Sequence, residues 1–157
     1  MDVAFVNAYV SAVQNVFRTM IGIEVAIGKP SLKNEALTVA DITGVMGFGG
    51  DKKGTFCLSF SKESAIFIYK TMIGDDADGI TADVVDAMGE LTNIISGQTR
   101  VEIEKLGHKL NAALPTVIKG QNVEIAFITK VPVVSMPFSF ALPDGGEGKM
   151  YLDFSFE

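Results

Sequence analysis

The feature that most constrains the fold of this chain is an internal repeat. The segment 54–61 aligns with 148–155, with four of the eight positions identical, and a glycine-rich turn precedes each. Two further pairs align in the same order: Gly22–Pro30 with Gly107–Pro115, and Val6–Ala8 with Val85–Ala87. Such a repeat predicts one structural unit used twice. We therefore expect a single domain over 1–157, with repeat halves of about 2–74 and 81–157.

The hydrophobic pattern separates helices from strands within each half. Apolar residues at helical spacing predict helices over 2–21, 62–73 and 82–105. The expected end signals are N-caps at Asp2, Ser61 and Thr81, and stops at Gly22 and Gly74. Alternating apolar residues predict strands over 23–27, 37–48, 55–60, 108–118 with a break, 123–129, 133–142 and 150–156. The segment 31–36 reads as a polar loop.

These elements define a fold class. We expect an α+β fold in which a duplicated α-β-β-β unit forms one largely antiparallel sheet, with the long helices packed on it. Pro132 and Pro137 cannot donate a backbone hydrogen bond, so the strand over 133–142 is expected to be bulged or near an edge.

Composition excludes several classes of protein. The net charge is −6, and no basic cluster is longer than Lys52-Lys53, which argues against a nucleic-acid partner. No apolar run approaches the roughly 20 residues of a membrane span, and the first residues lack the pattern of a signal peptide. One cysteine, Cys57, suits a reducing compartment. We expect a cytoplasmic protein without a membrane partner, and its 48% hydrophobic residues leave apolar surface for a subunit interface.

A polar stripe marks the helix predicted over 82–105. At about 100° per residue, Asp86, Glu90, Asn93 and Gly97 fall within about 60° of one another, opposite an apolar face. The repeat gives this stripe a counterpart in the first helix: Asn7, Ser11, Gln14 and Arg18. Ser11 aligns with Glu90 and Gln14 with Asn93, so only the second helix carries the acid and the asparagine. A purely structural requirement would act on both helices, and the difference favours a specific role for residues 90 and 93.

Other candidate motifs fail on spacing or on partners. Gly47–Thr55 lacks the spacing of a phosphate-binding loop and precedes a strand, so a hairpin turn explains it better. Asp76–Gly79 imitates part of a calcium loop, but the first and last ligands are missing. His108 is the only histidine, which leaves no histidine cluster for zinc and no Cys/His pair. We expect Cys57 to be half-buried and inert, and no metal site in this chain.

The stripe resembles the signature of the CheC/CheX family of bacterial chemotaxis phosphatases. The family motif is an acid, three residues, E-x-x-N, three residues and glycine, which correspond to Asp86, Glu90, Asn93 and Gly97. CheC-type members carry the motif in both long helices and CheX-type members only in the second, so this chain resembles the CheX type. The length, the repeat and the position of the motif after the midpoint extend the resemblance over essentially the whole chain.

The resemblance implies a phosphatase that hydrolyses the phospho-aspartate of a CheY-like response regulator. In that case Asn93 would orient the attacking water, because a carboxamide can both donate to and accept from it. Glu90 would pair with a lysine of the receiver domain, and Gly89 and Gly97 would let the partner's backbone come close. Asp86 would either extend this contact or solvate the helix face. The receiver would supply magnesium, and this chain would bind no cofactor.

An alternative from another class is a non-catalytic, dimeric binding or adaptor module that docks a receiver or other signalling protein through the same helix face. Both functions need the stripe, so the sequence does not separate them. The resemblance also implies a homodimer. We expect edge pairing in the region 123–142, where charge is low and apolar residues are bulky.

Overall fold

The computed structural model describes residues 3–33, 36–37, 40–127 and 130–157. Helix α1 (Val3–Val16) continues as a short π-helix, η1 (Phe17–Ile21), and ends at Gly22. Gly22 has φ 78° and donates its N–H to the Phe17 carbonyl oxygen at 2.8 Å. The predicted first helix is therefore confirmed for its described part, and the expected N-cap, Asp2, lies outside the described residues.

The other two helices begin at their predicted caps, and α2 also ends at its predicted stop. Ser61 accepts a hydrogen bond from the Ser64 N–H and opens α2 (Lys62–Ile73), which ends at Gly74 with φ 91°. Thr81 accepts from the Val84 N–H in the same way and opens α3 (Ala82–Lys105), the helix that carries the polar stripe. Side-chain caps of this kind satisfy backbone donors that a helix leaves free at its start.

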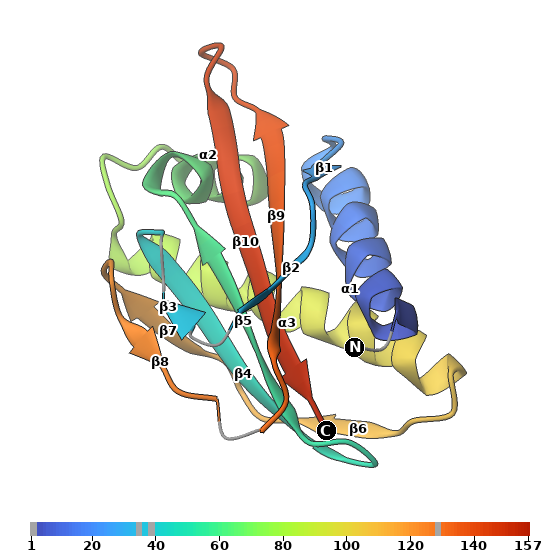
Figure 1. Ribbon diagram of the computed structural model, residues 1–157. Coiled ribbons are helices and arrows are strands. Elements are labelled where there is room, and N and C mark those ends of the chain that lie inside the picture. Colours follow the sequence, from blue (N-terminus) through green and yellow to red (C-terminus); the bar gives the residue numbers. More distant parts are fainter. Residues whose placement is uncertain (1–2, 34–35, 38–39, 128–129) are drawn as a thin grey trace.

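The strands form one eight-stranded antiparallel sheet and one small pair (Figure 1). The main sheet has the order β1-β9-β10-β5-β4-β6, with β2 also on β9 and β7 also on β4, and β3 pairs with β8. Their bounds are β1 Ala26–Ile27, β2 Ser31–Lys33, β3 Ala36–Leu37, β4 Ile42–Gly50, β5 Gly54–Phe60, β6 Leu110–Ala112, β7 Thr116–Lys119, β8 Glu124–Ile125, β9 Val133–Ala141 and β10 Glu147–Phe156. The α+β class and the largely antiparallel sheet are confirmed.

The sheet is symmetric with respect to the repeat: strands that correspond in the two halves lie at the same distance from opposite edges. The central strands β5 and β10 pair with Leu58 opposite Leu152, two residues that the sequence alignment equates. The first strands of each half pair with the other half: β1 and β2 with β9, and β6 and β7 with β4. This exchange interlocks the halves in one sheet. The residue bounds of the repeat, 2–74 and 81–157, stay a prediction.

Four strand predictions need correction, and one of them is the strand expected over 23–27, which is reduced to β1 over Ala26–Ile27. The segment 31–36 is not all loop, because β2 pairs with β9 over residues 31–33. The strand expected over 37–48 is regular only from Ile42 within the described residues. The strand expected over 123–129 is reduced to β8, and residues 128–129 lie outside the description. At residues 31–33, long-range pairing with β9 outweighs local polarity.

The expected edge pairing at 123–142 is wrong for β9, because this strand is covered on both sides by β10 and by β1 and β2. Pro137 is accommodated where β1 ends and before β2 begins, and the register shifts there by one residue. Gly28 lies in this break and donates its N–H to the Pro137 carbonyl at 2.8 Å. The bulge is thus on the partner strand, and the homodimer itself stays a prediction.

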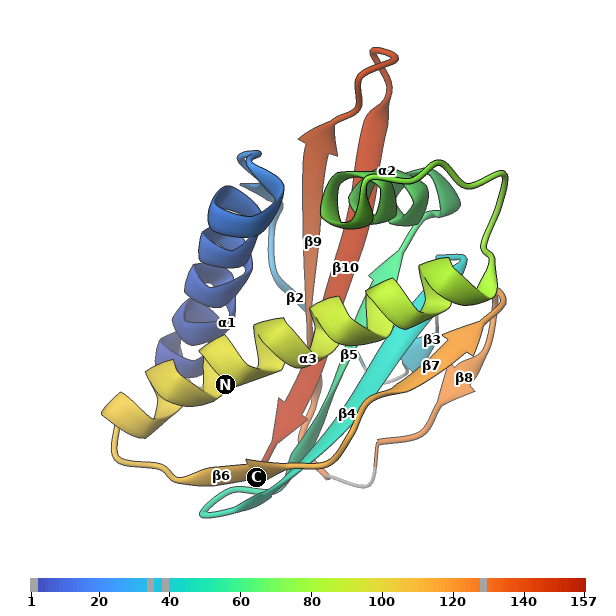
Figure 2. The same ribbon diagram turned by 180° about the vertical axis from the view of Figure 1, so that it is seen from behind.

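All three helices cover one face of the sheet (Figure 2). The inward residues of the central strands, such as Phe56, Leu58 and Leu152, are fully buried beneath them. The middle of the opposite face carries buried polar residues, and Thr43 and Ser59 share a hydrogen bond of 2.9 Å there. Cys57 is buried and not half-buried as expected. Its burial raises the pKa of the thiol to about 12, which favours the protonated form and agrees with the predicted low reactivity. Within the described part of the chain, no helix is long and apolar enough to cross a membrane.

Candidate functional site

The inner face of α3 is held tightly against the sheet. Met88, Leu91 and Ile95 have no exposed surface. Thr92 is also fully buried and packs directly on Gly44 of β4, where a Cβ atom would overlap the threonine side chain. A Cβ at Gly89 would lie 3.2 Å from the Val117 Cγ2 of β7. These short contacts fix the rotation of α3 about its axis and so determine which residues point outward.

The outer face of α3 carries the predicted polar stripe. Asp86 and Glu90 are exposed, and Asn93 and Gly97 are half-buried. Among the described residues, the Glu90 and Asn93 side chains have no hydrogen-bond or ion-pair partner. A Cβ at Gly97 would meet nothing within 4 Å. The structure therefore presents a carboxylate and a carboxamide one helical turn apart, both free to bind another molecule. Figure 2 shows α3 lying across the front of the sheet.

Gly89 does not belong to this exposed site. It was predicted to contact a partner, but it is buried and faces Val117 of β7. The physical reason for the glycine is close helix–sheet packing, because a larger residue would press on the valine side chain. Only Gly97, of the two helix glycines, leaves open surface beside Asn93.

The counterpart stripe on α1 lies in a different environment. Ser11, Gln14 and Arg18 border a polar hollow between α1 and α3, together with Asn15, Gln98 and Glu102. Several of these polar groups already have partners: Asn15 donates to the Gln98 Oε1 at 3.3 Å, and the Arg18 Nε lies 2.8 Å from the Glu24 Oε1. Among the described residues, Arg18 is thus the one member of the counterpart stripe whose side chain is paired within the chain.

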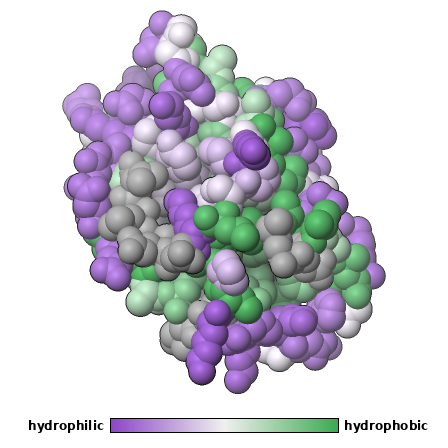
Figure 3. All heavy atoms as spheres, in the orientation of Figure 1, coloured by the Kyte–Doolittle hydropathy of each residue, from purple (hydrophilic) through white to green (hydrophobic). Residues whose placement is uncertain are grey.

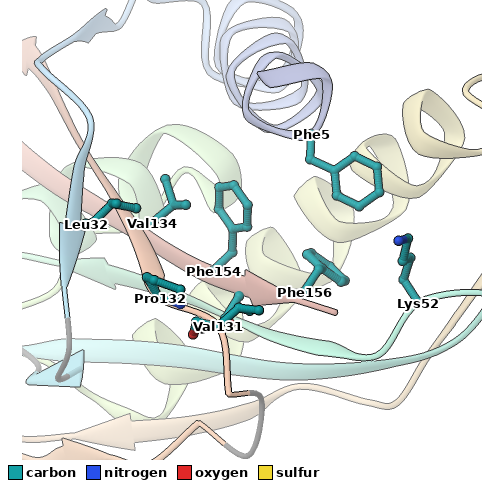
Figure 4. A pocket seen from close by; sticks show the side chains of 9 residues that line it. Phe5, Leu32, Lys52, Val131, Pro132, Val134, Phe154 and Phe156 are labelled. Atoms are coloured by element: carbon teal, nitrogen blue, oxygen red, sulfur yellow. Dashed lines mark hydrogen bonds between the residues drawn. The ribbon is translucent and has the colours of Figure 1, made fainter. Parts of the chain in front are cut away.

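A separate apolar pocket of about 220 Å³ has no group suited to the predicted chemistry. Figure 4 shows the rings of Phe5, Phe154 and Phe156 on this pocket, with Leu32 and Lys52 at opposite ends. Leu32 is 58% exposed. Hydrophobic surface gathers in the middle of the face seen in Figure 3. Among the described lining residues, Lys52 is the one charged side chain and Ser155 the one other polar side chain, and no carboxylate or carboxamide lines the pocket.

The motif does not include Arg100, although its spacing of seven residues from Asn93 places it on the same side of α3. Arg100 is half-buried. In the part of the chain that the structure describes, no group of three His, Cys, Asp or Glu residues could hold a metal ion. The expectation of a chain that binds no metal stays a prediction.

Comparison with known proteins identifies the family. The model of the chemotaxis phosphatase CheX family matches residues 42–139, which include the whole of α3. The CheY-P phosphatase CheX of Thermotoga maritima is 31% identical over 137 residues, covering 85% of this chain and 88% of the relative. A crystal structure of a chemotaxis protein CheX from Desulfovibrio desulfuricans is 36% identical, with a TM-score of 0.84 over 98% of this chain and 99% of that one.

A more distant structure shares the fold. It comes from the CheX–CheY–BeF3–Mg complex of Borrelia burgdorferi and is 22% identical, with a TM-score of 0.80 over 98% of this chain and 97% of that one. The fold, the outward position of Glu90 and Asn93, and the family match all agree with the same family. With more than half of its length matched by the family model and 31% identity to a relative over 85% of its residues, this chain belongs to the CheX family of chemotaxis phosphatases.

Proposed function

We propose that this chain hydrolyses the phospho-aspartate of a CheY-like receiver domain. The observation that carries the proposal is the pair Glu90 and Asn93, one turn apart on the outward face of a helix fixed to the sheet, where neither side chain has a partner among the described residues. A relative of 31% identity is named as a CheY-P phosphatase, and a more distant relative was crystallised with CheY, BeF3 and Mg. Both facts describe those proteins and support the same substrate here.

The proposed reaction requires few catalytic groups from this chain. In the proposed reaction the oxygen of a water attacks phosphorus, the bond from phosphorus to the aspartate oxygen breaks, and inorganic phosphate leaves the receiver. An acyl phosphate is already activated, so catalysis rests on holding the water in line. The Asn93 carboxamide accepts from and donates to this water. In this proposal the receiver holds magnesium, and no residue of this chain is assigned to it.

Glu90 is proposed as the docking residue for a receiver lysine. Its exposed carboxylate lies one turn before Asn93, so an ion pair there would set the rotation of the receiver about the inserted helix. Gly97 would allow the receiver backbone to approach on the other side of Asn93. Asp86, exposed one turn before Glu90, either adds a contact or solvates the helix.

We expect Glu90→Ala to weaken receiver binding and to lower the hydrolysis rate, each roughly tenfold, because a charge-assisted contact that also aligns the helix is lost. Binding is measured by calorimetry with a BeF3-activated receiver, and the rate by phosphate release. Glu104→Ala is the matched control, since Glu104 is an exposed acid of the same helix outside the motif. Equal effects of the two substitutions would contradict the assigned role.

The substitution Gly97→Ala is expected to affect protein stability and receiver docking in opposite directions. The open space around Gly97 means that an alanine fits, and we expect the free energy of unfolding to rise by about 1 kcal/mol from helix propensity. The same methyl group should raise KM for the phosphorylated receiver, because it stands where the partner approaches. Gly89→Ala should show no comparable gain in stability, since its methyl group would press on Val117. A Gly97→Ala variant with unchanged KM would remove Gly97 from the docking surface.

Phosphate release from a phosphorylated CheY-like receiver, with and without this chain, tests the function directly. Acceleration that depends on Asn93 supports a phosphatase. Tight binding of the activated receiver without acceleration would instead support the adaptor function, in which the same helix face only docks a partner.

A further inference from the structure

Arg100 is the one arginine or lysine of α3 that has no acidic partner among the residues that the structure describes. The helix carries five acids (Asp83, Asp86, Glu90, Glu102 and Glu104) and two basic residues, Arg100 and Lys105. Lys105 pairs with Glu102, with 3.1 Å from Nζ to Oε1. Arg100 makes no hydrogen bond or ion pair with any residue that the structure describes. Its charge is therefore available to a molecule outside the chain.

The burial of Arg100 adds to this argument. Its side chain is half-buried, and its Nε atom is buried without a partner among the described residues. A desolvated guanidinium donor without an acceptor costs free energy. The only other arginine of the chain, Arg18, is exposed and yet is paired through its Nε with Glu24. An arginine that is less hydrated and also unpaired is positioned to gain most from an incoming acceptor.

The position of Arg100 relates it to the proposed site. It follows Asn93 by seven residues on the same side of α3, which corresponds to about 10 Å along the helix axis. Gly97 lies between them and leaves the surface low. A molecule that covers Asn93 and Gly97 would therefore also reach Arg100.

The chemistry of the guanidinium and the charge of the chain select the kind of partner group. The fork of arginine donors matches a carboxylate in two-pronged geometry. A receiver that holds Mg²⁺ is acidic at that site, because carboxylates are the ligands that this ion prefers, and the carboxylate reached by Arg100 would be a further one outside the magnesium shell. The chain itself carries a net charge of −6, so two acidic surfaces must meet, and a local cation would offset their repulsion.

We propose that Arg100 is a docking residue that binds a carboxylate of the receiver surface, about 10 Å along the α3 axis from Asn93. The inference rests on the proposed function in taking the receiver as the partner. Arg100 determines how well the receiver binds and does not take part in the chemical step. Its removal should therefore act on KM and on the dissociation constant, not on kcat.

The test compares Arg100→Ala and Arg100→Lys with Lys105→Ala, which removes the other cation of the same helix. We expect Arg100→Ala to raise KM for the phosphorylated receiver, and Kd for the BeF3-activated receiver, about tenfold with kcat within twofold of the parent. Arg100→Lys should fall in between, because lysine keeps the charge and loses the fork. Lys105→Ala should change Kd less than about twofold, as for other solvated surface pairs. The salt dependence of Kd should flatten in Arg100→Ala alone.

An unchanged Kd in Arg100→Ala would overturn the inference, even if thermal melting showed that the variant is less stable than the parent. The binding measurement does not need hydrolysis, which keeps the two proposals distinguishable. If the parent chain binds the receiver but releases no phosphate, the proposed activity fails while Arg100 is still tested. If the parent chain does not bind the receiver, both proposals fall.

Discussion

Replacing Asn93 by alanine is expected to slow phosphate release from a phosphorylated CheY-like receiver about 100-fold, because the attacking water loses the group that holds it in line. Binding of the BeF3-activated receiver should change little, since Asn93 contributes one polar contact within a larger surface. Stability should also be nearly unaffected, because the Asn93 side chain has no hydrogen-bond partner among the described residues. Single-turnover phosphate release and calorimetric binding measure the two effects separately.

Gln98→Ala is the matched control for this experiment. Gln98 is an exposed carboxamide of the same helix, but it faces α1 and accepts from Asn15. Its loss should leave the hydrolysis rate within about twofold, because a surface substitution outside the site rarely does more. A hydrolysis rate of the Asn93→Ala variant equal to that of the parent would contradict the enzymatic proposal. Intact binding with no hydrolysis by the parent chain would favour the adaptor function.

Gly44→Ala is expected to lower the free energy of unfolding by about 2 kcal/mol, because the added methyl group would overlap the buried side chain of Thr92. Since Thr92 directly precedes Asn93, any relaxation should shift the site. The hydrolysis rate should therefore fall together with stability. Urea unfolding curves and phosphate release, measured on the same preparations, check both effects.

Two further variants make this prediction specific. Gly47→Ala lies on the same strand, where a Cβ would meet nothing within 4 Å, and should not destabilise the protein. Thr92→Ala combined with Gly44→Ala should recover part of the lost stability by removing the overlapping atoms. The recovery should be partial, because the Thr92 Cβ would still lie 2.9 Å from the new methyl carbon. Equal effects at Gly44 and Gly47 would show that the contact with Thr92 is not the cause.

Much of the local structure was predictable because its causes lie within a few residues. Thr81 and Ser61 satisfy free N–H groups three positions later, so the starts of α3 and α2 follow from sequence alone. The helical period likewise placed Glu90 and Asn93 on the face opposite Leu91. The repeat and the strand pattern predicted one largely antiparallel sheet, and in the structure the aligned residues Leu58 and Leu152 lie opposite each other.

The tertiary structure alone decided how these pieces meet. Gly89 and Gly97 are the same residue type on one helix, yet Val117 covers the first and leaves the second open. No local pattern separates them, because Val117 comes from a strand that lies beside the helix only after folding. The exchange of β1 and β2 onto β9 likewise joins segments about a hundred residues apart, and it accommodates Pro137 opposite a break.

The sequence by itself therefore determined the polar pair of α3, the helix ends and the antiparallel fold class, since caps and periodicity act over short stretches of chain. Tertiary structure decided which glycine is surface and which is packing, where the sheet edges lie, and that Arg100 has no acidic partner among the described residues. These properties depend on contacts between distant segments, which a local pattern does not specify.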